Sequence, residues 1–142
     1  MNNPTIPQNE LLKHRWGWSR YLYVGEETAL AIAWGKKGGA SSLHYHHGKH
    51  NSFLVLAGEV RIDQRDDAQV SEGAPILPRL LTVGQCLTVP ATQDHRMVFL
   101  EDSVLHEIYQ ALPYMLIDLD DITRFDDGWE PGRGPSGRLG ST

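Results

Sequence analysis

The sequence predicts an all-β fold built from short strands, and three observations support this prediction. Glycine and proline interrupt the chain about every dozen residues, a spacing typical of strands joined by turns. The segments between them alternate apolar with polar residues or form short apolar runs, and no long amphipathic helical pattern is present. The length, 142 residues, suits a single domain with its own core. Together these observations predict a β-sandwich or barrel.

The predicted elements follow in order along the chain. We expect strands at 28–34, 41–46, 52–56, 59–63, 80–83, 86–89, 95–100 and 104–109. The turn at Ala57–Gly58 joins two of them as a hairpin, and residues 64–79 are predicted to form a long surface loop. Residues 116–125 suit one helical turn or an edge segment. The Gly/Pro-rich end is predicted to be a tail, so we expect one domain at 1–125 and a tail at 126–142.

Composition restricts the class of partner and the compartment. The chain has 18 acidic and 13 basic residues, a formal charge of -5, which argues against a nucleic-acid or anionic-membrane surface. Residues 1–7 do not resemble a secretory leader, and no apolar run approaches the roughly 20 residues that span a bilayer. We therefore expect a cytoplasmic protein. Cys86 has no partner for an internal disulfide and is expected to be a buried small hydrophobe.

The histidines are the strongest functional signal. Four of the seven histidines fall within residues 44–50. On an extended strand His44 and His46 point to the same face, and His95 from a later strand could complete one side of a metal ion. A lone histidine is more often a surface or core residue, and we assign His14 and His106 that role.

Two spacing patterns surround these three histidines. The first is Gly38-x5-His44-x-His46-x4-Asn51-x6-Gly58, and the second is Gly84-x5-Pro90-x-Thr92-x2-His95-x3-Phe99. They resemble the two motifs of the cupin superfamily, Gly-x5-His-x-His-x4-Glu-x6-Gly and Gly-x5-Pro-x-Gly-x2-His-x3-Asn. The resemblance implies a double-stranded β-helix, a jelly-roll barrel, with metal motifs at 38–58 and 84–99. It also implies metal ligands at positions 44, 46, 51 and 95.

A narrower resemblance covers nearly the whole chain. The matching segments are Trp16-Gly17-Trp18, Ser42-Leu43-His44-Tyr45-His46 and Leu119 to Asp127 with Gly132-Arg133. They are similar to the C-terminal cupin domain of type II mannose-6-phosphate isomerases, which implies a metal-dependent sugar-phosphate isomerase. The departures lie at the metal site: the family has Gln at position 44, Glu at position 51 and Arg at position 49, where this chain has His44, Asn51 and Lys49.

These departures make the predicted centre a three-histidine one. Three neutral imidazoles are a competent facial set for Zn²⁺, Fe²⁺, Mn²⁺ or Ni²⁺. The missing carboxylate leaves one more positive charge, which favours an anionic substrate. Asn51 either contributes its amide oxygen or only a hydrogen bond. His50 is an alternative ligand if the turn rotates, although a one-residue shift on a strand moves a side chain to the other face.

Isomerisation also requires a base and cationic groups. Glu107 is the predicted base if its strand turns it inward, and His50 is the other candidate. Lys49 and Arg124 could bind an anionic group. The alternative roles are an exposed turn lysine for Lys49 and, for Arg124, a solvated partner of the neighbouring acidic residues.

Three functions remain open from the sequence. The first is a sugar or sugar-phosphate isomerase, the second a three-histidine Fe(II) dioxygenase, and the third a non-catalytic cupin that binds a small ligand. In each case we expect a small-molecule partner, which for the first is a sugar or sugar phosphate. Exposed sheet edges also predict a homodimer.

Overall fold

The computed structural model describes residues 9–65 and 76–132, and every regular element in these ranges is a β-strand. The all-β prediction is therefore confirmed. The strands are β1 (Leu12–His14), β2 (Gly17–Val24), β3 (Thr28–Gly35), β4 (His44–Tyr45), β5 (Lys49–Ala57), β6 (Glu59–Arg65), β7 (Ile76–Thr82), β8 (Cys86–Val89), β9 (His95–Phe99), β10 (Ser103–Ala111) and β11 (Thr123–Arg124).

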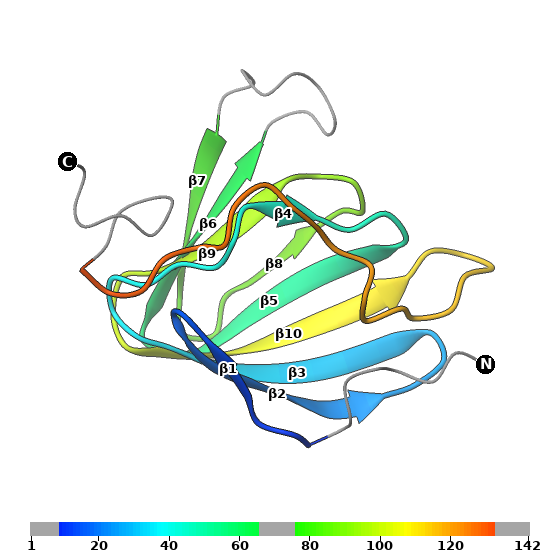
Figure 1. Ribbon diagram of the computed structural model, residues 1–142, viewed down its shortest axis with the longest axis horizontal. Helices are drawn as coiled ribbons and strands as arrows, with labels where there is room; N and C mark the ends of the chain where they lie inside the picture. The colour runs from blue at the N-terminus through cyan, green and yellow to red at the C-terminus, as the bar shows by residue number, and fades with distance from the viewer. Residues whose placement is uncertain (1–8, 66–75, 133–142) are drawn as a thin grey trace.

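The strands form two antiparallel sheets that face each other as a jelly roll (Figure 1). One sheet has the order β1-β2-β3-β10-β5-β8, and the other has the order β11-β4-β9-β6-β7. Strands distant in sequence become neighbours in this arrangement, because β10 lies between β3 and β5. The two halves of the predicted metal motif meet where β4 pairs with β9.

Alanines on β3 make room inside the barrel. Ala29, Ala31 and Ala33 are at most 2 % exposed, and the larger residues between them are half-buried on the other face. Ala31 is paired with Glu107 of β10 and Ala29 with Tyr109. Small side chains on one strand therefore leave space beside long polar ones on its neighbour.

An apolar core fills one end of the interior. Its members share near-complete burial and come from both sheets: Phe53, Val55, Val60, Ile62, Phe99 and Leu105, with Trp16 stacked on Phe99 at a centroid distance of 5.1 Å. The β5–β6 hairpin predicted at Ala57–Gly58 is present. Gly58 has φ +84°, and a Cβ there would lie 2.3 Å from the Ser103 hydroxyl, so this turn requires glycine.

Several predicted boundaries were wrong. β6 extends to Arg65 and β7 begins at Ile76, so both ends of the predicted loop 64–79 are paired strand, and its middle lies outside the described residues. Pro78 is tolerated in β7 because that strand is an edge of its sheet. β2 was not predicted as a strand. In 116–125 only the short edge strand β11 forms. Cys86 is exposed rather than buried, because on β8 the alternate residues Leu87 and Val89 face the core.

The segment that follows β11 lies against the barrel. Trp129 pairs with Ala40 through backbone hydrogen bonds, and the Arg96 guanidinium binds the Asp126 carboxylate and lies 4.5 Å from the Trp129 ring centroid. The predicted domain boundary at residue 125 stays a prediction, as does the predicted homodimer.

Within 9–65 and 76–132, no helix has the length and apolar content needed to cross a membrane.

Candidate metal centre and adjoining pocket

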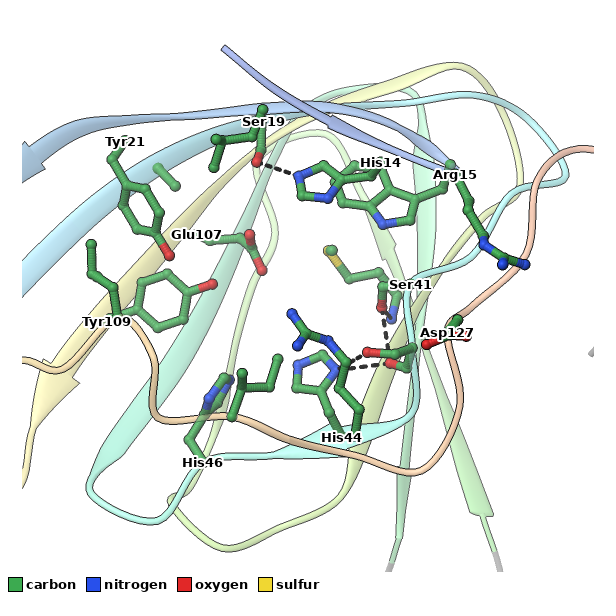
Figure 2. Close-up of a pocket in the computed structure, with 18 of the residues that line it drawn as sticks. His14, Arg15, Ser19, Tyr21, Ser41, His44, His46, Glu107, Tyr109 and Asp127 are labelled. Carbon is green, nitrogen blue, oxygen red and sulfur yellow. Dashed lines mark hydrogen bonds between the residues drawn. The ribbon is translucent and has the colours of Figure 1, made fainter. Parts of the chain in front are cut away.

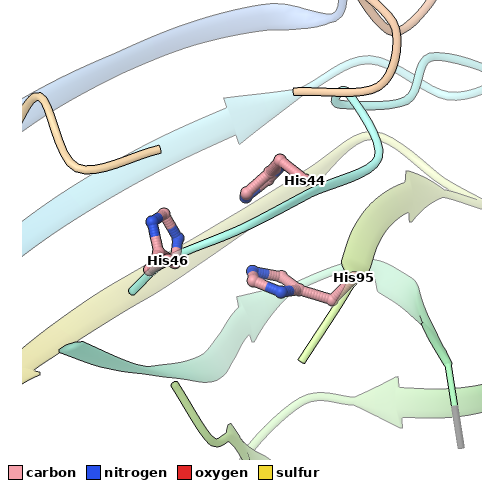
Figure 3. A group of neighbouring side chains, drawn as sticks. All are labelled: His44, His46 and His95. Carbon is pink, nitrogen blue, oxygen red and sulfur yellow. The ribbon is translucent and has the colours of Figure 1, made fainter. Parts of the chain in front are cut away.

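Three histidines converge inside the barrel. His44 lies on β4, His95 is its paired residue on β9, and His46 follows β4 directly. One ring nitrogen from each residue lies within 4.8 Å of the corresponding nitrogens of the other two, and all three residues are buried (Figure 3). His44 and His46 thus share a face, as the alternation in residues 43–47 predicts, and the pairing of β4 with β9 adds His95.

Backbone carbonyls fix the orientation of all three rings. Nδ1 of His44 lies 2.8 Å from the Ser42 carbonyl oxygen, Nδ1 of His46 2.7 Å from that of Asp121, and Nδ1 of His95 2.9 Å from that of Gln93. A carbonyl can only accept, so each Nδ1 carries the proton. Each Nε2 then has a free lone pair. Such outer hydrogen bonds are typical of histidines that bind a metal.

The electrostatics of the cluster favour neutral imidazoles. Burial lowers the pKa of His46 to about 4 and that of His95 to about 3, and it lowers the pKa of His44 as well. Within the described part of the chain, the buried Nε2 of His46 has no hydrogen-bond partner. Three convergent lone pairs, one of them orphaned, fit a divalent cation.

Asn51 occupies the fourth position of the predicted ligand set. Its side chain is 1 % exposed, and Oδ1 lies 3.3 Å from Nε2 of His95. Because His95 is protonated on Nδ1, these two atoms are both acceptors, and a cation between them would satisfy both. His50, the alternative, lies on the opposite face of β5, where Nδ1 accepts the Ala91 N–H at 3.0 Å. The structure thus brings Asn51 to the histidines and does not bring His50 there.

A cavity of about 400 Å³ opens beside this cluster. His44, His46 and Glu107 form part of its wall (Figure 2). Lys49 and Arg124 also line it. Its size falls in the range of small-molecule sites. Three of the four residues predicted to act on a substrate therefore line the same cavity as His44 and His46, and the fourth, His50, does not.

Glu107 is the titratable carboxyl inside this cavity. It lies on β10 between Leu105 and Tyr109, which are also buried, and it is 8 % exposed. Burial raises the pKa of Glu107 to about 7, although hydrogen bonding to Tyr109 and the nearby Lys49 charge oppose the shift. Both protonation states are populated near neutrality, which suits proton transfer.

Lys49 and Arg124 supply positive charge. Lys49 is 2 % exposed, its Nζ donates to the Asp118 carbonyl oxygen at 2.5 Å, and it lies 5.0 Å from the Tyr109 ring centroid. Burial lowers its pKa. It is therefore not the exposed turn lysine that was the alternative. Arg124 on β11 is paired with His44 and is exposed at the cavity wall.

Other cavity residues were missed from the sequence. His14, Ser19 and Tyr21 reach the cavity from β1 and β2, and Tyr109 from β10. Parity on β10 gives a signal for Tyr109, because it shares a face with Glu107. His14 carries no local signal, since only the packing of the N-terminal hairpin places it there.

No protein-family model matches the chain, and no curated protein matches its sequence. Solved structures do match. Oxalate decarboxylase from Bacillus subtilis at pH 4.6 has a TM-score of 0.67 and 13 % identity over 87 % of this chain and 33 % of its own. KdgF from Halomonas sp. has a TM-score of 0.58 and 13 % identity over 74 % of this chain and 88 % of its own.

A third match is CapF in complex with 3-isopropenyl-tropolone, with a TM-score of 0.62 and 19 % identity over 85 % of this chain and 34 % of its own. The chain spans about a third of the length of the oxalate decarboxylase chains that it matches. At these identities the likeness concerns the fold, which is the cupin jelly roll. The chain thus has a jelly-roll fold like that of these structures, and the fold holds a buried three-histidine cluster.

Proposed function

We propose that the protein binds a divalent metal ion through His44, His46 and His95 and isomerises a sugar or sugar phosphate between its aldose and ketose forms. One observation carries this proposal. A buried carboxyl group that titrates near neutrality, Glu107, shares a cavity with His44 and His46 of a metal-competent cluster. The similarity of the sequence to type II mannose-6-phosphate isomerases supports the same reaction.

The chain's own groups have distinct roles in this reaction. A bound divalent ion would polarise the substrate carbonyl and hydroxyl oxygens. The Glu107 carboxylate takes a proton from the carbon beside the carbonyl and returns it to the former carbonyl carbon, while a second proton moves between the two oxygens. Lys49 and Arg124 attract an anionic group such as a phosphate.

A second function is favoured by a different observation. Position 51 holds a buried amide where a carboxylate would complete the isomerase ligand set, so the centre offers three neutral imidazoles. A three-histidine set resembles the Fe(II) cupin dioxygenases more than the isomerases. A cupin that binds a small ligand without catalysis is the remaining alternative.

Metal analysis and oxygen dependence separate these functions. The full chain is purified without added metal, its content is measured, and it is reconstituted with Zn²⁺, Fe²⁺, Mn²⁺ or Ni²⁺. The isomerase proposal expects interconversion of mannose 6-phosphate and fructose 6-phosphate without oxygen, and loss of the activity in Glu107→Gln. Oxygen consumption that requires Fe²⁺ would support the dioxygenase instead, and no metal after reconstitution would contradict both.

Restoring the acid tests the role of position 51. Asn51→Glu should raise metal affinity and isomerase activity if the chain is an isomerase that has lost its carboxylate ligand. Asn51→Gln is the matched control, because it has the same length without the charge. If Asn51→Glu instead abolishes the native activity, the three-histidine centre is itself the working form and the isomerase proposal loses its support.

A further inference from the structure

The N-terminal hairpin brings a histidine to the cavity that the proposed reaction does not use. His14 is the last residue of β1, and its backbone pairs with Gly17 of β2. Its side chain lines the same cavity as His44, His46 and Glu107. Figure 2 shows His14 and Ser19 on one side of the cavity and His44 and His46 on the other.

The His14 ring is held in a fixed orientation. It stacks on Trp16 with a centroid distance of 4.5 Å and an interplanar angle of 3°, and Trp16 in turn stacks on Phe99 in the core. Nε2 lies 2.6 Å from the hydroxyl oxygen of Ser19, which is 7 % exposed. Two independent contacts therefore set the plane of the ring and its rotation within that plane. Such support is typical of a side chain positioned for binding.

The other ring nitrogen faces the cavity. Figure 2 shows it on the side of the ring turned toward the interior, and the described residues offer it no hydrogen-bond partner. Burial, with a contribution from Arg124, lowers the pKa of His14 to about 4, so the ring is neutral at neutral pH. In either tautomer Nδ1 offers the cavity one donor or one acceptor. A hydroxyl group complements both, because it can donate and accept.

The surrounding groups indicate the class of ligand. The cavity combines an acceptor at Glu107, cationic donors at Lys49 and Arg124, and hydroxyls at Ser41 and Ser42. A ligand that spans it from the metal cluster to His14 needs oxygen atoms along its length. We propose that His14 binds a hydroxyl group of a polyhydroxylated substrate whose reacting end lies at His44 and His46. This inference rests on the proposed function only in placing the substrate at the cluster.

Binding of a defined probe tests the inference without relying on turnover. Fructose 6-phosphate is titrated calorimetrically into the Zn²⁺-loaded full chain. His14→Phe keeps the stack on Trp16 but removes both nitrogens, and it should weaken binding about three- to tenfold, the effect of one lost hydrogen bond. Ser19→Ala, which releases the ring, should weaken binding about two- to threefold. The zinc content should stay unchanged.

His106→Phe is the matched control. His106 precedes Glu107 on β10 and faces the other side of the sheet, so its loss should leave probe affinity unchanged. A direct readout is the ¹⁵N resonance of His14 Nδ1, which should shift when the probe is added to the wild-type protein. That measurement and Ser19→Ala decide the question if His14→Phe does not fold.

Two results would overturn the inference. One is a His14→Phe variant that binds the probe as tightly as the wild type, and the other is a Zn²⁺-loaded wild type that does not bind fructose 6-phosphate. Failure of the proposed isomerisation looks different. In that case the probe binds and His14→Phe weakens it, but no mannose 6-phosphate forms, and only the isomerase proposal is lost.

Discussion

The two ends of the barrel interior differ although the same strands build both. On β10, Leu105 is fully buried in the apolar core, and Glu107, two residues later on the same face, lines the cavity. On β5, Phe53 and Val55 belong to the core, and Asn51 and Lys49 lie at the site. One step of two residues along each strand changes the interior from apolar to polar.

This difference shows how a small barrel separates stability from function. Burial of apolar surface at the apolar end stabilises the folded state by about 25 cal/mol per Å². The polar end buries imidazoles, a lysine and a carboxyl group, which are costly to desolvate unless they are paired or bind a ligand. Substitutions at the two ends should therefore have different consequences.

The largest effect on folding should come from the apolar end. Leu105→Ala leaves a cavity where the side chain is fully buried, and it should lower the free energy of unfolding by about 2–5 kcal/mol. Urea denaturation measures this loss. Ile108→Ala on the same strand, where the side chain is 37 % exposed, is the control and should cost much less. Equal losses would contradict the assignment of the core to this end.

The largest effect on metal binding should come from the polar end. His95→Ala removes one convergent ligand and should weaken Zn²⁺ affinity by more than about 100-fold, because even outer hydrogen-bond partners of a ligand cost 10- to 100-fold. Competition with a chromogenic chelator measures it, with His106→Ala as control. Unchanged affinity in His95→Ala would show that the cluster does not hold the metal.

The buried carboxyl group of Glu107 should make the free energy of unfolding depend on pH. Its folded-state pKa is raised from 4.5 to about 7, so the folded protein keeps a proton that the unfolded chain has released between these values. Stability conferred by that proton is lost as the pH rises through this range. Glu107→Gln should remove this loss, so at pH 8 its free energy of unfolding should exceed that of the metal-free wild type by about 3 kcal/mol, with little difference at pH 4. Parallel pH profiles in urea denaturation would contradict it.

The smallest effect concerns the loop that precedes β9. Thr92 has φ +73°, a left-handed conformation that is unfavourable for a β-branched residue, and the cupin motif has glycine at this position. Its N–H donates to the His46 carbonyl oxygen at 2.6 Å. Thr92→Gly should raise the free energy of unfolding by roughly 1 kcal/mol. This is a net value, because relief of the backbone strain stabilises the folded state while the greater flexibility of glycine in the unfolded chain destabilises it. Thr88→Gly is the control and should be destabilising, because Thr88 lies in a strand. A Thr92→Gly variant that is less stable than the wild type would show that position 92 is unstrained.

Local patterns allowed much of this structure to be predicted. The spacing of His44 and His46 predicts a shared face, and the β5–β6 hairpin follows from the Gly58 turn. The alternation also predicts that His50 and Asn51 face opposite ways. β2 and the extension of β7 were not predicted, because their exposed and partly exposed residues show no clear apolar alternation.

The sequence by itself determined the all-β class, the shared face of His44 and His46 and the two motifs, because these depend on turns and on a two-residue period that are local properties of the chain. Only the tertiary structure decided that Lys49 is buried, that the β3 alanines leave space beside Glu107, and that His14 reaches the cavity. Burial and proximity depend on which strands become neighbours, and the jelly roll brings together strands that are far apart in sequence.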